Sequence, residues 1–80
     1  MTQLSARIGR MVRFHRKKAQ LTQLRLANLA EVGKTAVFDI EKGKATVRLS
    51  TLLAVLHVLN IQMEFRGPLM HRFKELDETS

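Results

Sequence analysis

Five side chains on one short stretch offer groups that can read the edges of nucleobases. Lys34 can donate to guanine O6 or N7, Thr35 can donate or accept, and Asp39 can accept from cytosine N4. The methyl group of Ala36 can meet a thymine methyl group. Phe38 lies among them, although an aromatic ring at such a position is more often a partly buried packing residue. These five residues are the candidate base contacts.

Polar and basic residues flank this stretch and suit the phosphates of a nucleic acid. Gln23 opens a predicted helix, where its amide and the positive helix end favour a phosphate. The other candidate phosphate contacts are Thr22, Lys42, Lys44 and Arg48. Arg7 and Arg10 lie on the first predicted helix, where we interpret them as solvated residues too far from this surface to take part.

The charge of the chain favours a polyanionic partner without proving one. Fourteen Lys and Arg stand against seven Asp and Glu, a formal charge of +7, and seven positive side chains precede the first acidic residue. Clustered cations favour nucleic acid, but a solvated basic surface with no partner explains the charge equally well. RNA is the weaker option because the chain has no Tyr or Trp to stack on bases.

Other classes of function find little support. The three histidines, His15, His57 and His71, lie on separate predicted elements with no carboxylate pair, so we expect no catalytic, metal or cofactor site. No cysteine is present, and we expect a cytoplasmic protein. The most apolar stretch, 49–61, is too short and too polar for a bilayer. A membrane-active basic peptide is disfavoured because the later helices predict a folded globule.

Helical spacing of apolar residues and capping residues predict four helices that position these groups. The first runs from Leu4 to near Lys17, and the second follows an N-cap at Thr22 and ends near Ala30. The third runs from Lys34 to about Lys42 and stops at Gly43 in a left-handed conformation. Ser50 is expected to cap the fourth, which Asn60 closes.

Strict alternation of apolar and polar residues over 61–66 predicts one β-strand. A lone strand leaves its backbone groups unpaired, so we expect it to pair with its copy in a homodimer, with Ile61, Met63 and Phe65 facing the helices. The alternative is an extended tail that packs Phe65 on the core. We therefore predict a domain over 1–66 and a tail over 67–80 that is helical or disordered.

The segment LTQLRLANLAEVGKTAVFDIEKGK resembles the helix-turn-helix family of phage repressors and xenobiotic-response-element regulators, without insertion. Glu31 stands where the family usually has Gly, and Gly33 where it has Ser or Thr. The resemblance implies an all-α, four- to five-helix, lambda-repressor-like domain bound to double-stranded DNA. It also implies a structural salt bridge between Arg16 and Glu41. The residues that carry the resemblance are Leu21, Thr22, Gln23, Leu26, Ala27, Val32, Val37, Ile40, Glu41 and Gly43.

The longer stretch from Val32 to Phe65 looks most like HipB-type antitoxins. That resemblance implies a dimeric repressor that binds a palindromic operator, regulates its own operon and binds a HipA-type serine/threonine kinase toxin. Two alternatives stay open, a stand-alone regulator of phage-repressor type and a protein whose main task is to inhibit a toxin.

Overall fold

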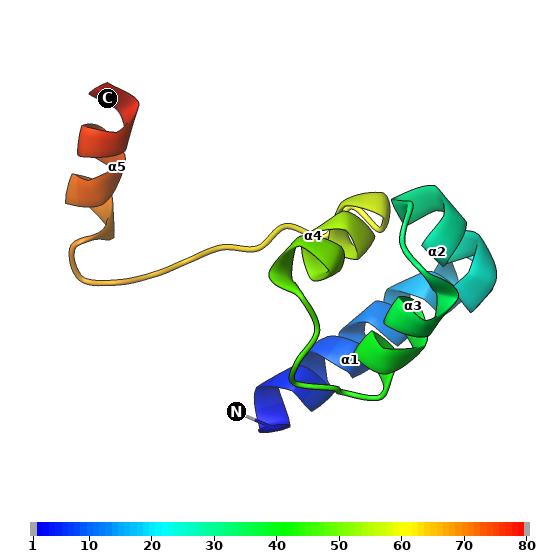
Figure 1. The fold of residues 1–80 in the computed structure, drawn as a ribbon. Helices are drawn as coiled ribbons and strands as arrows, with labels where there is room; N and C mark the ends of the chain where they lie inside the picture. Colours follow the sequence, from blue (N-terminus) through cyan, green and yellow to red (C-terminus); the bar gives the residue numbers. More distant parts are fainter. Residues whose placement is uncertain (1, 80) are drawn as a thin grey trace.

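The computed structural model describes residues 2–79; residues 1 and 80, which belong to the predicted domain and tail, lie outside the described range. The described chain is all-helical, and its helices are α1 (Thr2–Lys18), α2 (Gln23–Ala30), α3 (Lys34–Glu41), α4 (Leu49–Val58) and α5 (Met70–Thr79). Helices α1 to α4 form one body, and α5 stands apart from it at the end of an extended segment (Figure 1). None of these helices is both long enough and apolar enough to cross a membrane.

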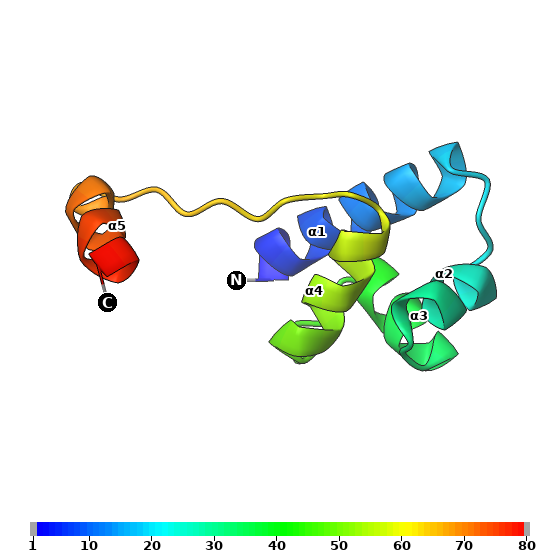
Figure 2. The same ribbon diagram turned by 90° about the horizontal axis from the view of Figure 1, so that it is seen from above.

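The core of the body lies where the four helices meet. Helix α3 packs against both α1 and α2, and α4 packs mainly against α2 and to a smaller extent against α3 (Figure 2). Burying these apolar side chains supplies the main free energy that holds α3 in place. The buried apolar residues are Val12, Leu26, Ala27, Val37, Ile40, Val55 and Leu56.

Two glycines allow α1 to approach the end of α3 closely. A Cβ at Gly9 would lie against the carbonyl oxygen of Ile40 and 2.8 Å from that of Glu41. Gly43 ends α3 with a φ of +83°, and a Cβ there would lie 2.9 Å from the Cα of Ala6. The left-handed conformation predicted at Gly43 is therefore present, and only glycine adopts it without strain.

Capping residues fix both ends of α2 and the start of α3. The Oγ1 of Thr22 accepts a hydrogen bond of 3.0 Å from the backbone N–H of Arg25, as expected of an N-cap. Glu31 ends α2 in the left-handed conformation, with a φ of 57°, which glycine adopts at lower cost. Gly33 caps α3 with its backbone alone.

The boundaries of α4 differ from the prediction at its start. The helix begins at Leu49, with Arg48 at the N-cap and no side-chain hydrogen bond there, so the predicted cap at Ser50 is wrong. The residue pattern alone does not fix the first turn of a helix to within a residue. At the other end, Asn60 has a φ of 58°, as expected of a residue that closes a helix.

The predicted strand over 61–66 is wrong. Residues 61–67 run extended, but no strand is assigned anywhere between residues 2 and 79. A strand exists only where its backbone groups bond to a neighbouring strand, and the described chain offers none. Only Ile61 packs against the core, whereas Met63 and Phe65 are exposed, so these three residues do not share a face toward the helices.

Candidate nucleic-acid interface

The outer face of α3 presents several of the predicted base contacts to solvent. Val37 and Ile40 form the buried side of α3, and Lys34 and Thr35 are exposed at its first turn. A first turn that points away from the body is the part of a helix that reaches base edges in a major groove. Ala36 is half-buried beside them.

Phe38 lies on this outer face and not in the core. Its side chain is 45% exposed, and the Nζ of Lys42 lies 5.1 Å from the centre of its ring. An ammonium group at that distance is attracted to the face of an aromatic ring. The ring and the charge therefore form one unit at the C-terminal end of the exposed surface.

Asp39, the remaining predicted base contact, forms an ion pair with another residue of the chain. Its Oδ2 lies 3.5 Å from the Nζ of Lys44, one of the predicted phosphate contacts. The pair is partly exposed, and such surface ion pairs contribute about 0 to 1 kcal/mol. DNA could therefore compete for either group at small cost.

Arg16 and Glu41 form the buried ion pair that the family resemblance implies. The Nε of Arg16 donates to Glu41 Oε2 at 2.6 Å and its Nη2 donates to Oε1 at 3.0 Å. Its Nη1 donates to the carbonyl oxygen of Leu21 at 2.8 Å. The hydrogen bond to Glu41 raises the pKa of Arg16, burial lowers it, and the negative charge of Glu41 raises it further. One guanidinium thus joins α1, the start of the turn before α2, and the end of α3.

Gln23 is drawn into the same network. Its Nε2 donates to Glu41 Oε1 at 3.1 Å, which fixes the amide at the first residue of α2. The hydroxyl oxygen of the adjacent Thr22 accepts the hydrogen bond that caps α2. Both predicted phosphate contacts are therefore held in position at a positive helix end.

The structure adds two cations that the sequence analysis left out. Arg13 and Lys17 of α1 line a shallow hollow of about 270 Å³ together with Gln23, Phe38 and Lys42. The hollow joins the exposed face of α3 to the first residue of α2. Arg13 stands three residues before Arg16 and four before Lys17, so the expected contact of Arg16 with Glu41 was the signal that could have placed them near α3.

The remaining cations lie outside this hollow. Arg48 is exposed at the start of α4, and Lys44 lines a different hollow between α1 and α4. Arg7 and Arg10 line a third hollow beside Leu4. We define the α3 surface as Lys34, Thr35 and Phe38 with the hollow formed by Arg13, Lys17, Gln23 and Lys42.

Comparison with known proteins points to one family. The family described as Helix-turn-helix matches residues 12–65, which include α2, the turn and α3. The chain is 38% identical over 63 residues to an uncharacterized HTH-type transcriptional regulator of Sinorhizobium fredii, covering 79% of this chain and 83% of that protein. It is also 38% identical over 56 residues to the immunity repressor protein of Bacillus phage phi105, covering 70% of this chain and 39% of that protein.

Proposed function

Because the chain belongs to the Helix-turn-helix family, we propose that it is a sequence-specific transcriptional repressor of phage-repressor type that places α3 in the major groove of DNA. The α3 surface is the observation that carries this proposal. Lys34 and Thr35 supply groups that read base edges, and they project from a helix whose opposite side is buried. Phosphates beside the groove would meet Arg13, Lys17 and Lys42.

The network around Glu41 supports the same function because it fixes the docking angle. Arg16 and Gln23 both donate to Glu41, which couples α1 and α2 to the end of α3. Groups held by buried hydrogen bonds meet DNA without a further loss of conformational entropy. The phosphate contacts and the base contacts therefore sit on one rigid unit.

The length of α3 favours binding as a homodimer. Eight residues at about 1.5 Å each make a helix of about 12 Å, which spans three or four base pairs at about 3.4 Å each. So short a site gives little specificity. Two copies on a palindromic operator double the bases that are read and match a two-fold symmetric protein.

The antitoxin role rests on the HipB resemblance alone. A HipA-type kinase partner would need a docking surface, and neither relative is named for a toxin or a kinase. The phage immunity repressor, by contrast, is named for repression. We therefore place the stand-alone repressor ahead of the antitoxin.

Selection from random duplexes tests the proposal. Full-length protein should enrich a palindromic sequence, and the double variant Lys34→Ala with Thr35→Ala should lose the preference for that sequence at an unchanged melting temperature. Arg72→Ala, which removes an exposed charge on α5, is the control and should bind like the wild type. Failure to enrich any sequence, or full sequence preference in the double variant, would contradict the proposal.

A further inference from the structure

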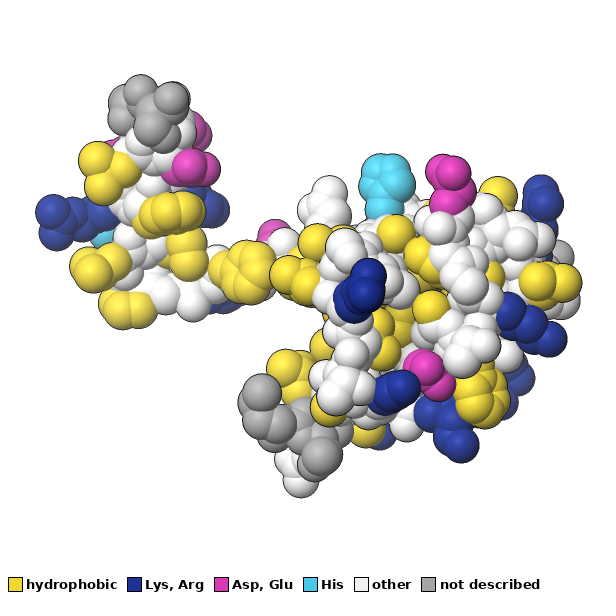
Figure 3. Space-filling model, in the orientation of Figure 1, with side chains coloured by type: hydrophobic (Ala, Val, Ile, Leu, Met, Phe, Trp, Pro, Cys, Tyr) yellow, Lys and Arg dark blue, Asp and Glu magenta, His cyan; other side chains and the backbone are white. Residues whose placement is uncertain are grey.

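The C-terminal segment carries an exposed apolar surface. Leu69, Phe73 and Leu76 recur at spacings of four and three residues, which places them on one side of α5. They are 64%, 58% and 70% exposed, and Phe65 on the extended segment is 70% exposed. Hydrophobic side chains follow one another along the segment and over α5 (Figure 3). Exposed apolar surface of this extent marks an interaction site.

A helix of this kind needs a partner to be stable. Helix α5 has ten residues, and isolated helices shorter than about 12 to 15 residues are marginal in water. In both views it is separated from α1 to α4 (Figures 1 and 2). Its stability must therefore come from packing its apolar side against another surface.

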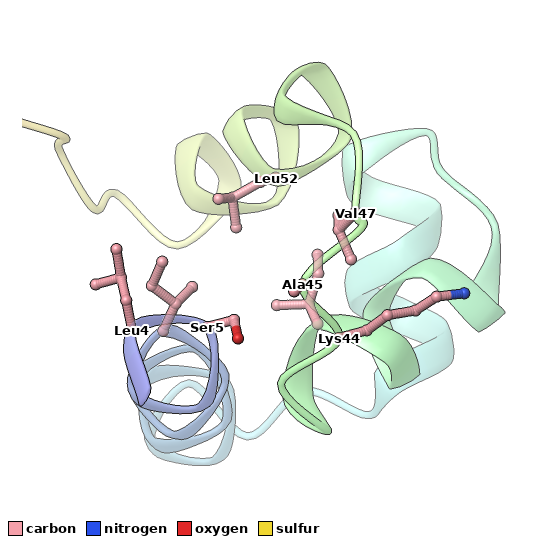
Figure 4. Close-up of a pocket in the computed structure, with 8 residues that line it drawn as sticks. Leu4, Ser5, Lys44, Ala45, Val47 and Leu52 are labelled. Carbon is pink, nitrogen blue, oxygen red and sulfur yellow. The ribbon is translucent and has the colours of Figure 1, made fainter. Parts of the chain in front are cut away.

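The body carries an apolar hollow between the N-terminal half of α1 and α4. Leu4 and Ile8 of α1, Val47 of the loop and Leu52 of α4 line a space of about 180 Å³. The side chains of Leu4, Val47 and Leu52 point into it from three elements (Figure 4). Leu4 is 59% exposed at its edge, so the hollow is open to an incoming apolar side chain.

The charges beside the hollow complement those of α5. Leu4 also borders the neighbouring hollow that contains Arg7 and Arg10. On α5, Glu75 and Glu78 flank Leu76, and no Lys or Arg follows Lys74. An apolar hollow beside two guanidinium groups thus matches a helix with an apolar side and an acidic end.

The direction of the extended segment favours a second copy as the occupant. Residues 61–67 contain no turn, and the turns on either side of them lie at Leu59 and Asn60, directly after α4, and at Pro68 and Leu69. The segment therefore carries α5 away from its own body (Figure 1). A reciprocal exchange between two copies would bury both surfaces twice, with two-fold symmetry.

We propose that α5 of one chain docks in the hollow between α1 and α4 of a second chain, with Phe73 or Leu76 inserted beside Leu4 and the acidic end of α5 against Arg7 and Arg10. This inference specifies the contact for the homodimer proposed above. It gives Arg7 and Arg10 a role that is independent of DNA.

Complementation between two variants tests the exchange. Leu4→Asp places an acid at the edge of the hollow, and Phe73→Lys places a base on α5. Each variant alone should dimerise at least tenfold more weakly than the wild type in sedimentation velocity. A 1:1 mixture should recover the dimer because one contact is then wild type and the other pairs Asp with Lys. Leu29→Asp, at an exposed leucine of α2, is the matched control and should dimerise like the wild type.

Three outcomes would overturn the exchange. They are a monomeric wild type, dimers unaffected by either variant, and loss of the dimer in Phe73→Lys alone, which would indicate that two α5 helices pair with each other. Thermal melting of each variant separates loss of the contact from loss of the fold. If the protein selects a DNA sequence but the variants show no exchange, only the exchange is contradicted. If the variants show the exchange but the dimer selects no DNA sequence, only the proposed repressor function is contradicted.

Discussion

Glu41 accepts hydrogen bonds from residues of two other helices, and its partner Arg16 is 8% exposed. A carboxylate that receives a bidentate guanidinium and an amide has its lone pairs well satisfied, so the desolvation of both charges is compensated. Removing one member would leave the other charged and buried. The pair therefore acts on the fold first and on DNA binding only through it.

Arg16→Ala should lower the free energy of unfolding by about 3 to 5 kcal/mol, because Glu41 is left as a buried, unpaired charge. Chemical denaturation followed by circular dichroism measures the change. Lys44→Ala, which breaks the partly exposed pair with Asp39, should cost no more than about 1 kcal/mol. An Arg16→Ala protein with wild-type stability and no DNA binding would show that Arg16 contacts DNA instead.

Glu31 is the second residue whose effect on the free energy of unfolding can be predicted. It is exposed and holds the left-handed conformation at the end of α2. Glu31→Gly should raise the free energy of unfolding by about 1 kcal/mol. A non-glycine residue is destabilised by about 1 to 2 kcal/mol in this conformation. Glycine avoids that cost, but it loses more backbone entropy on folding, which cancels part of the gain. The melting temperature should rise by about 4 to 8 °C. A lower melting temperature would indicate that the Glu31 side chain stabilises the turn.

At the scale of elements, the close approach of α1 to the end of α3 sets the position of the α3 surface. Gly9 permits this approach because a side chain there would meet the backbone of Ile40 and Glu41. Backbone atoms cannot move aside as a flexible side chain can. The crossing of these two helices therefore depends on a residue that makes no side-chain contact of its own.

Gly9→Ala should destabilise the protein by about 1 to 3 kcal/mol through overpacking, which outweighs the gain of about 1 kcal/mol that alanine brings to a helix interior. Thermal melting measures it. Gly33→Ser is the control: nothing lies within 4 Å of a Cβ there, and a serine N-cap should leave stability unchanged or raise it by a few tenths of a kcal/mol. Equal stability of Gly9→Ala and the wild type would contradict the close approach.

The sequence predicted α1 to α4 because their signals are local. Helical spacing placed Val37 and Ile40 inside, Thr22 marked a start, and Gly43 and Asn60 marked two ends. The strand prediction was wrong because alternation of apolar and polar residues indicates a half-exposed extended chain but does not supply the neighbouring strand that a strand requires. The end of the chain stayed open between helix and disorder because the stability of a short helix depends on what packs against it.

Apart from what the family resemblance implied and the phosphate contact predicted at Gln23, the candidate site could be predicted where neighbours in space are neighbours in sequence. Lys34, Thr35 and Phe38 follow one another on α3, so the helix period places them on or near one face. Arg13 and Lys17 come from α1, and their closeness to Phe38 depends on the angle at which α1 crosses α3. The engagement of Asp39 with Lys44 likewise depends on how the chain turns after α3.

For the whole molecule, the distribution of charge predicts how DNA binding depends on salt. The formal charge is +7, and Arg13, Lys17 and Lys42 gather beside α3. Lys17→Ala should weaken binding to every duplex and reduce the slope of log K against log salt by about 0.9, the value for one phosphate contact. Titrations at several salt concentrations measure the slope. An unchanged slope would place Lys17 outside the interface.

The most direct test of the account is the effect of Lys34→Ala on a set of duplexes in which each base pair of the selected site is changed in turn. The account predicts that Lys34→Ala loses about 1 to 3 kcal/mol of discrimination at one base pair of each half-site and keeps the wild-type preference elsewhere. Lys17→Ala should instead weaken all duplexes equally. Equal weakening of every duplex by Lys34→Ala, or discrimination identical to the wild type, would contradict the claim that α3 reads DNA sequence.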